Sequence, residues 1–254
     1  MEGEQLSNSA VSKTVVVKLG GSIFVGEDSY REVAAFFVRR LRECVQERLL
    51  VVVSARNGLT DELESLARRI TGEPDSRTLD LLWATGEMRS VALLTLHLKD
   101  MGIAAVGLNI HETGLRLDGA SIERPGIEVI PQQIERELRE HSVVVVPGFF
   151  GMHDGGAIAS LGRGGSDLSA VLLADELDAS QCELIKDVSG YFTTDPSIDP
   201  AAEHLPNVSY ERAIAMADDG CELVQRKALE AARLRRLRLV IRSLDHMAPT
   251  SIVS

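Results

Sequence analysis

Near the start of the chain stands Thr14-Val15-Val16-Val17-Lys18-Leu19-Gly20-Gly21-Ser22, an apolar, β-branched run that ends in two glycines. Such a run favours a buried strand, and the glycines indicate a turn at its carboxyl end. Residues 49–54 form a nearly continuous apolar run, and residues 143–146 form another. Between the first run and residues 49–54, residues 31–46 place apolar side chains at helical spacing. Strands that alternate with helices predict right-handed βαβ units and an α/β fold.

The rest of the chain continues this alternation. A further helix is predicted from about Asp61, with Thr60 placed to cap it. The other predicted helices are 78–99, interrupted at Thr85-Gly86-Glu87, and 131–140, 166–177, 210–217 and 223–235; the other predicted strands are 103–108, 183–188, 237–242 and 251–253. The pattern predicts a three-layer αβα sandwich with a largely parallel central sheet, in which ligands collect at the carboxyl ends of the strands.

Composition narrows the range of functions. The chain has 254 residues, 44% hydrophobic and 26% charged, with a net charge of −11. Such an acidic protein is a poor general binder of nucleic acid. Its three cysteines form no C-x-x-C pair and its six histidines are scattered, so we expect no metal ligands from the protein. We expect residues 1–12 to be a disordered tail and residues 13–254 to form one domain. No apolar run is long enough to span a bilayer, so the cytoplasm is the expected compartment.

The turn after the first strand suggests phosphate binding. Gly20 and Gly21 let backbone N–H groups approach phosphate oxygens, and Lys18 supplies a positive charge for them. A plain β-turn with a solvated lysine explains this piece alone equally well. Neither a P-loop nor a G-x-G-x-x-G turn follows the strand.

A second glycine-rich stretch, Leu161-Gly162-Arg163-Gly164-Gly165-Ser166-Asp167, runs into a predicted helix. Ser166 is placed to cap that helix, whose N-terminus can hold an anion. Arg163 offers a planar fork for a carboxylate or phosphate, and Asp167 adds an acceptor beside it. The alternative is a capped helix with a flexible entry loop. An arginine between glycines favours a binding site.

Six motifs together resemble the catalytic domain of aspartokinases, in the amino acid kinase superfamily, from Lys18 to about Ile252. They are Lys18-Leu19-Gly20-Gly21-Ser22, Val53-Ser54-Ala55 with Gly58-Leu59-Thr60, Thr85-Gly86-Glu87, Gly148-Phe149-Phe150-Gly151, Leu161 to Asp167, and Asp187-Val188-Ser189-Gly190 with Thr193-Thr194-Asp195-Pro196. The resemblance implies the carbamate kinase-like fold, ATP and Mg²⁺ as cofactors, a small amino acid or related acid as substrate, and a homodimer or larger homo-oligomer. It also implies an acid-substrate lobe in residues 13–150 and a nucleotide lobe in 151–254.

The resemblance assigns roles residue by residue. Lys18 and Asp167 match the catalytic residues nearest the transferring phosphate. The substrate-binding positions are Ser54, Thr60, Glu87, Phe149, Arg163 and Ser166, in which the arginine pairs with the substrate carboxylate and the glutamate faces its ammonium group. The cofactor-binding positions are Gly20, Gly21, Ser22, Gly164, Lys186, Asp187, Phe192, Asp195 and Lys227.

This chain departs from the aspartokinase pattern mainly in the nucleotide half. Glu222 replaces a lysine, Ser197 replaces an arginine and Phe192 replaces a tyrosine, while Lys186 stands where a small polar residue is common. Lys227 is a candidate second phosphate lysine, or else a solvated lysine on a helix face. From the resemblance we expect a catalytic domain without regulatory ACT domains, and therefore no internal feedback control.

Three functions fit these residues. The first is an ATP-dependent kinase that makes an acyl phosphate from an aspartate-like amino acid. The second is a sister kinase with another small acid, phosphonate or phosphate ester as acceptor. The third is a non-catalytic subunit that binds a nucleotide or an anion. Fold alone does not separate them.

Overall fold

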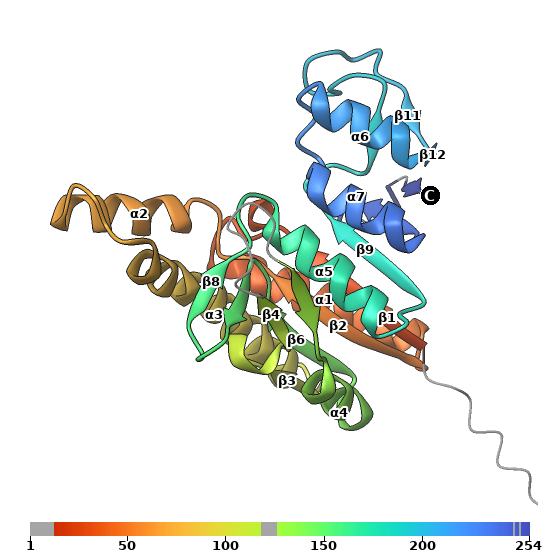
Figure 1. The fold of residues 1–254 in the computed structure, drawn as a ribbon. Helices are drawn as coiled ribbons and strands as arrows, with labels where there is room; N and C mark the ends of the chain where they lie inside the picture. Colours follow the sequence, from red (N-terminus) through yellow and green to blue (C-terminus); the bar gives the residue numbers. More distant parts are fainter. Residues whose placement is uncertain (1–12, 118–125, 246, 249) are drawn as a thin grey trace, which may run out of the picture.

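The computed structural model describes residues 13–117, 126–245, 247–248 and 250–254, so the tail predicted for residues 1–12 lies outside the described residues. Figure 1 shows the fold. The central sheet has eight strands in the order β12-β14-β13-β9-β1-β2-β6-β3. These are β1 (Lys13–Leu19), β2 (Glu47–Val53), β3 (Ala105–Gly107), β6 (Val143–Pro147), β9 (Gln181–Ile185), β12 (Asn207–Val208), β13 (Leu239–Arg242) and β14 (Ser251–Val253). Every pair is parallel except β13 with β14.

One face of the sheet is covered by α1 (Glu27–Glu43) and α3 (Ser76–Asp100). Inward-facing residues of β1, such as Val15 and Val17, pack there with Phe37 of α1 and Leu94 of α3, and all four side chains are buried. Side chains of a strand alternate between the two faces, so Val16 lies in the core on the other side.

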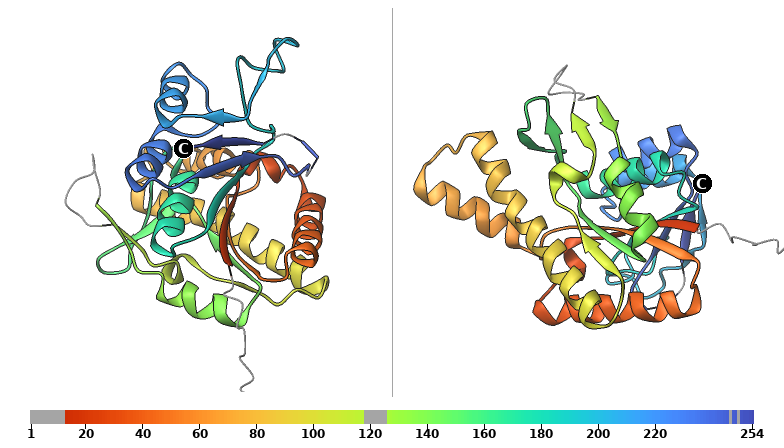
Figure 2. Two further views of the ribbon diagram at one scale, coloured as in Figure 1. Left: turned by 90° about the vertical axis from the view of Figure 1, so that its right-hand side faces the viewer. Right: turned by 90° about the horizontal axis from the view of Figure 1, so that it is seen from below.

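The opposite face is covered by α4 (Gln132–Glu140), α5 (Gly165–Glu176), α6 (Tyr210–Asp218) and α7 (Arg226–Arg235). Figure 2 (left) shows α1 and α5 on opposite sides of β1 and β9. These three layers confirm the predicted αβα sandwich. Strands from both predicted lobes join the same sheet.

Smaller elements lie around this frame. A second sheet has the order β5-β4-β7-β8, formed by β4 (Leu115–Leu117), β5 (Ile127–Val129), β7 (Phe150–His153) and β8 (Ile158–Ser160). β10 (Tyr191–Phe192) and β11 (His204–Leu205) form a two-stranded ribbon. The remaining elements are the helix α2 (Leu59–Ile70) and the 3₁₀ turns η1 (Gly21–Ile23) and η2 (Ile110–Glu112). In the part of the chain that the structure describes, no helix is long and apolar enough to cross a membrane.

Three local predictions were wrong. Helix α3 runs through Thr85-Gly86-Glu87 without interruption. Gly86 serves packing instead, because a Cβ there would lie 3.0 Å from that of Ala55. The N-caps of α2 and α5 are Gly58 and Gly164, both left-handed, so Thr60 and Ser166 lie inside the first turns and cap neither helix. Their hydroxyl groups are therefore free for other contacts.

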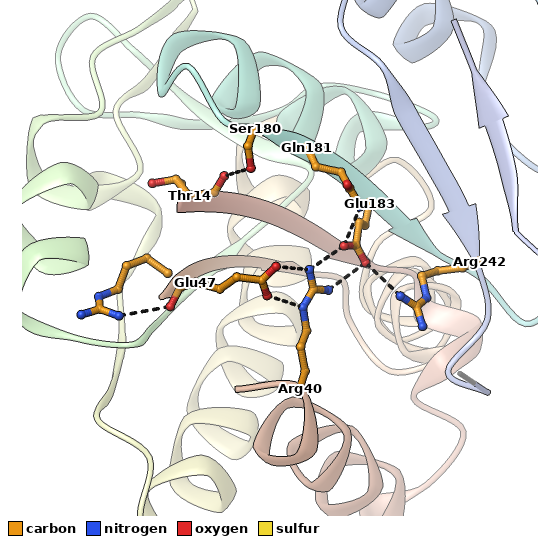
Figure 3. A network of polar contacts seen from close by, with 8 residues as sticks. Thr14, Arg40, Glu47, Ser180, Gln181, Glu183 and Arg242 are labelled. Carbon is orange, nitrogen blue, oxygen red and sulfur yellow. Dashed lines mark hydrogen bonds and ion pairs between the residues drawn. The ribbon is translucent and has the colours of Figure 1, made fainter. Parts of the chain in front are cut away.

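A buried charge network ties α1 to the sheet (Figure 3). Arg40 donates to both oxygens of Glu183, at 2.8 and 2.6 Å, and its Nε donates to Glu47 at 2.7 Å. Glu183 is only 1% exposed, and Arg242 lies 3.7 Å from it. Because buried charges need such partners, this network holds α1, β2, β9 and β13 in one arrangement.

Candidate active site

The candidate site lies where neighbouring parallel strands end. Leu19 of β1 pairs in register with Val53 of β2 and with Ile185 of β9. The residues at or just beyond these ends, Lys18, Ser54 and Lys186, therefore share one edge of the sheet. Parallel α/β sheets bind ligands at this edge.

Asp167, in the first turn of α5, joins two lysines. Its Oδ1 lies 2.7 Å from Lys18 Nζ and its Oδ2 lies 2.9 Å from Lys186 Nζ. The three side chains are 3%, 7% and 11% exposed, for Asp167, Lys18 and Lys186. One carboxylate with two ammonium groups leaves a net positive charge at the sheet edge, where an anion is stabilised.

This arrangement shifts the pKa values of the groups. Burial raises the pKa of the Asp167 carboxyl, but Lys18 and Lys186 outweigh burial and hold that pKa well below its usual range. Burial also lowers the pKa of Lys18 to about 8, helped by the like charge of Lys186 and opposed by Asp167. Asp167 is thus a fixed anion, and Lys18 can lose its proton in mildly alkaline solution.

Two cavities meet at this edge. The first, which we name the lysine cavity, has a volume of about 230 Å³. It is lined by Lys18, Phe149, Gly164, Gly165, Ser166, Asp167, Lys186, Glu222 and Gln225. The second, the Glu87 cavity, has about 240 Å³ and is lined by Gly21, Ser54, Ala55, Arg56, Asn57, Gly58, Thr60, Glu87, Phe149 and Ser166. Phe149 and Ser166 line both, so the two cavities are adjacent.

Glu87 gives the second cavity its character. The residue is 4% exposed; its Oε1 accepts from the backbone N–H of Ala55 at 3.2 Å, while the buried Oε2 has no hydrogen-bond partner within the described chain. Burial raises the pKa of Glu87 to about 7. A buried carboxyl with a free oxygen suits a cationic ligand such as an ammonium group.

Phe149 lies between the two cavities, and its backbone conformation is strained. Its φ of 72° is in the left-handed region, which a bulky residue rarely adopts. The conformation is held because its N–H donates to Ser169 at 3.2 Å and its carbonyl accepts from Leu161 at 2.7 Å. Beside it, the Ser54 hydroxyl donates to that of Ser166 at 3.0 Å across the boundary.

The structure does not bring Arg163 into either cavity. Its side chain is 83% exposed and lies 3.7 Å from Glu222, which is itself 75% exposed. Gly162 and Gly164, with φ of 75° and 77°, flank this arginine on both sides. The predicted contact of Arg163 with a substrate carboxylate therefore needs a movement of this loop.

The remaining predicted residues of the nucleotide half are less closely gathered. Lys227 is exposed in the first turn of α7, and Gly162 is its neighbour: a Cβ added to that glycine would lie 3.9 Å from Lys227 Nζ. Asp187 and Asp195 are exposed, and Asp195 accepts from the Ser197 N–H and hydroxyl, which lowers the pKa of Asp195. Phe192 is half-buried in β10 against His204.

The glycine turn after β1 forms η1, with buried Gly20 as its N-cap and half-buried Ser22 inside it. A Cβ on Gly20 would lie 3.3 Å from Lys18 Nζ, and one on Gly21 would lie 3.0 Å from the Ala55 carbonyl oxygen. Gln225 was missed by sequence reasoning. It fits against Gly164, where a Cβ would lie 2.4 Å from the Gln225 side chain. Only the approach of α7 to α5 brings it there.

The described residues hold no group of three His, Cys, Asp or Glu side chains that could bind a metal ion. Asp167 is the buried carboxylate of the lysine cavity, and both its oxygens are engaged by lysines. These residues do not form a Mg²⁺ site by themselves. A larger cavity of about 410 Å³ lies near Thr14, Arg48 and Arg139 and contains none of the predicted site residues.

Comparison with known proteins identifies the family of this chain. A model of the amino acid kinase family matches residues 13–243. The chain belongs to this family of kinases. An aspartokinase of Thermus thermophilus is 39% identical over 239 residues, which cover 94% of this chain and 58% of that protein. An aspartate kinase of Pseudomonas putida is 38% identical over 218 residues, covering 86% and 53%.

Solved structures give the same result. The aspartate kinase from Synechocystis superimposes with a TM-score of 0.83 at 34% identity, covering 95% of this chain and 40% of that chain. E. coli aspartokinase III in complex with aspartate and ADP, at 24% identity, shares the fold with a TM-score of 0.79. The chain spans about half the length of the curated relatives it matches.

Proposed function

We propose that this chain transfers the γ-phosphoryl group of ATP to a carboxylate of aspartate or a closely similar amino acid. The observation that best supports this proposal is the pair of adjacent cavities. One contains Lys18, Asp167 and Lys186, and the other contains Glu87. Phosphate oxygens fit the first and an amino acid ammonium group fits the second. The relatives named above support aspartate as the acceptor.

In this reaction an acceptor carboxylate oxygen forms a bond to the γ-phosphorus, the bond from that phosphorus to the bridging oxygen breaks, and ADP leaves with the bond electrons. The acceptor is already ionised at neutral pH, so no general base is required. This suits Asp167, whose depressed pKa makes it a poor base. Lys18 and Lys186 would stabilise the transferring phosphoryl charge, and Asp167 would position both ammonium groups.

On the acceptor side, Glu87 is proposed to bind the ammonium group, with Ser54, Thr60 and Ser166 contacting the amino acid. Phe149 would fix the boundary between acceptor and donor. Arg163 is proposed to leave Glu222 and hold a carboxylate of the substrate, a movement that the flanking left-handed glycines permit.

On the donor side, the backbone of Gly20, Gly21, Ser22 and Gly164 is proposed to contact phosphate oxygens. Asp187, Phe192, Asp195 and Lys227 would contact the nucleotide. Mg²⁺ would enter as the complex with ATP, held mainly by phosphate oxygens, in keeping with its preference for phosphate and water ligands. We also expect the chain to act as a homo-oligomer.

The direct test follows ADP formation with ATP, Mg²⁺ and L-aspartate, and traps the acyl phosphate with hydroxylamine as a hydroxamate. We expect aspartate-dependent ADP release that matches hydroxamate formation and is lost in Asp167→Asn. ADP release without hydroxamate would show that the acceptor is water or a non-carboxylate group, and no turnover with aspartate would refute the assignment.

A second candidate is a kinase for another small acid, phosphonate or phosphate ester. It is favoured by the position of Arg163, outside the Glu87 cavity and beside Glu222. A panel of such acceptors in the same ADP assay separates the two, because a clear preference for aspartate would reject this candidate. Calorimetry with ATP and Mg²⁺ completes the test: binding without turnover on any acceptor would indicate a non-catalytic subunit.

A further inference from the structure

A small apolar cluster lies between α3 and the second sheet, next to the candidate site. Its buried members are Ala84 of α3, Ile110 of η2 and Phe150 of β7, and the residues packed against them are Trp83, Met88, Phe149, Met152 and Ile158. Trp83 is the single tryptophan of the chain. The cluster connects α3, the helix that carries Glu87, to Phe149, the residue that lines both cavities.

Trp83 and Glu87 are four residues apart on α3, so their side chains leave the helix on the same side. Glu87 lines the acceptor cavity, whereas Trp83 is not one of the described residues that line either cavity. The rings of Trp83 and Phe149 have centroids 6.5 Å apart, with an angle of 58° between their planes, a geometry typical of aromatic pairs. Trp83 therefore reaches the site through Phe149.

The conformation of Phe149 depends on such neighbours. A bulky residue with a φ of 72° persists only where its surroundings hold it in place. On one side its ring packs edge-on against Phe150, with centroids 4.9 Å apart. On the side of α5, a Cβ added to Gly165 would lie 3.0 Å from Phe149 Cδ2. Trp83 supports the ring from the side of α3, so its removal would give the ring space to turn away from the cavities.

The indole N–H of Trp83 is buried and has no hydrogen-bond partner within the described part of the chain. A buried donor without a partner is unfavourable for the folded state. The size of the Trp83 ring, rather than its hydrogen-bonding group, is therefore what this residue contributes to the cluster.

We propose that Trp83 is a positioning residue that sets the acceptor specificity of the site. It holds the ring of Phe149 in place, so that the space between Glu87 and the lysine cavity fits an amino acid of the length of aspartate. An acid with one more methylene group, such as glutamate, requires the ring to withdraw towards α3. The inference rests on the proposed function and names a determinant of its acceptor.

The test compares kcat/KM for aspartate and glutamate in the ADP assay. The unmodified protein should prefer aspartate by about 10- to 200-fold, the usual effect of one methylene group. Trp83→Ala should raise the ratio of glutamate to aspartate activity by about tenfold. Trp83→Phe keeps an aromatic ring and should largely restore the preference of the unmodified protein.

Both acids are assayed on one preparation, so the ratio does not depend on the fraction of folded protein. Trp83→Leu, which removes less volume, replaces Trp83→Ala if the alanine variant does not fold. The matched control is Leu93→Ala, a truncation of another half-buried side chain of α3 that packs against the core on the sheet. It should lower stability and leave the ratio unchanged. An unchanged ratio in the Trp83 variants, or an equal rise in Leu93→Ala, would overturn the proposal.

A double-mutant cycle tests whether Trp83 acts through Phe149. In a Phe149→Ala background the ring that Trp83 supports is absent, so Trp83→Ala should cause no further change in the ratio. Effects of the two substitutions that simply add would show that Trp83 acts by another route.

Calorimetric Kd values for the two acids separate this inference from the proposed reaction. If both acids bind and neither yields ADP, the reaction is contradicted, and the ratio of the Kd values tests Trp83 in the same variants. If aspartate is phosphorylated and the Trp83 variants keep the original ratio, the inference is contradicted and the reaction stands. Binding of neither acid would contradict both.

Discussion

Replacement of Lys186 by methionine tests the charge cluster around Asp167 most directly. Methionine keeps much of the side-chain length and removes the charge. Lys186 and Lys18 share one carboxylate, so the variant leaves Asp167 with Lys18 as its ammonium partner. We expect two results together: weaker phosphoryl transfer, and a higher pKa for Lys18, whose pKa the like charge of Lys186 now lowers.

The magnitudes follow from electrostatics. Two like charges about 5 Å apart repel by about 3 kcal/mol at an effective dielectric constant near 20, which corresponds to about two pKa units. Water in the open cavity screens part of this, so we expect the pKa of Lys18 to rise by about one unit. Loss of one group that stabilises developing charge typically lowers the rate by about 100- to 1000-fold.

The assay is ADP formation at a series of pH values, analysed as kcat/KM for ATP, which reports the free enzyme. Because transfer needs protonated Lys18, activity of the unmodified protein should fall as pH rises through about 8. In Lys186→Met the residual activity should fall about one pH unit higher. Lys99→Met, at an exposed position near the end of α3, is the control. It should change neither kcat/KM for ATP nor the pH at which activity falls. If the pH at which kcat/KM falls were unchanged or lower in Lys186→Met, the reasoning would be refuted.

Three further variants test other parts of the structure. Glu87→Gln should stabilise the protein at pH 8 by about 1–3 kcal/mol in urea unfolding, because folding raises the pKa of this carboxyl from 4.5 to about 7, so that stability is lost as pH rises from 4.5 to 7 and the full cost is present at pH 8. The variant should also raise KM for the amino acid, and unchanged values for both would contradict the assigned role. Glu222→Gln should lower KM for ATP by up to about fivefold and leave the urea midpoint unchanged, since its ion pair with Arg163 is exposed; a large loss of stability would count against this. Glu183→Ala should cost about 3–5 kcal/mol in urea unfolding, because it removes the buried carboxylate to which Arg40 donates twice and leaves the half-buried Arg40 with Glu47 alone; a cost below about 1 kcal/mol would show that the network is dispensable.

The main elements were predictable because their patterns are strong. The continuous apolar runs at β1, β2 and β6 predict strands whose two faces are both buried. Such strands are typical of a parallel sheet with helices on both sides. The sheet of β4, β5, β7 and β8 was not predictable, since each of its strands has only three or four residues. The predicted interruption of α3 was wrong because a glycine within a helical pattern usually indicates a break. Here Gly86 instead leaves room for the side chain of Ala55, which packs against α3.

Within the site, sequence motifs located the groups but not their contacts. Lys186 was assigned to the nucleotide, and its two contacts with Asp167 arise only from the return of the chain from α5 into β9. The position of Arg163 was equally hidden, because it depends on two left-handed glycines and on Glu222, about sixty residues further along the chain. Such contacts depend on tertiary geometry, which residue spacing does not encode.

The acidic Glu222 does not cancel the positive charge of the lysine cavity, because Glu222 is exposed to water whereas the two lysines are nearly buried. Two unit charges 4 Å apart interact by about 1 kcal/mol in water and by about 4 kcal/mol at an effective dielectric constant of 20. Glu222 is 75% exposed and faces Arg163, so its charge is both screened and partly neutralised. Lys18 and Lys186 are almost buried, and one carboxylate compensates only one of them. A phosphate at the floor of the cavity would therefore interact more strongly with the lysines than with Glu222, and the reversed charge should tune the binding of ATP without abolishing it.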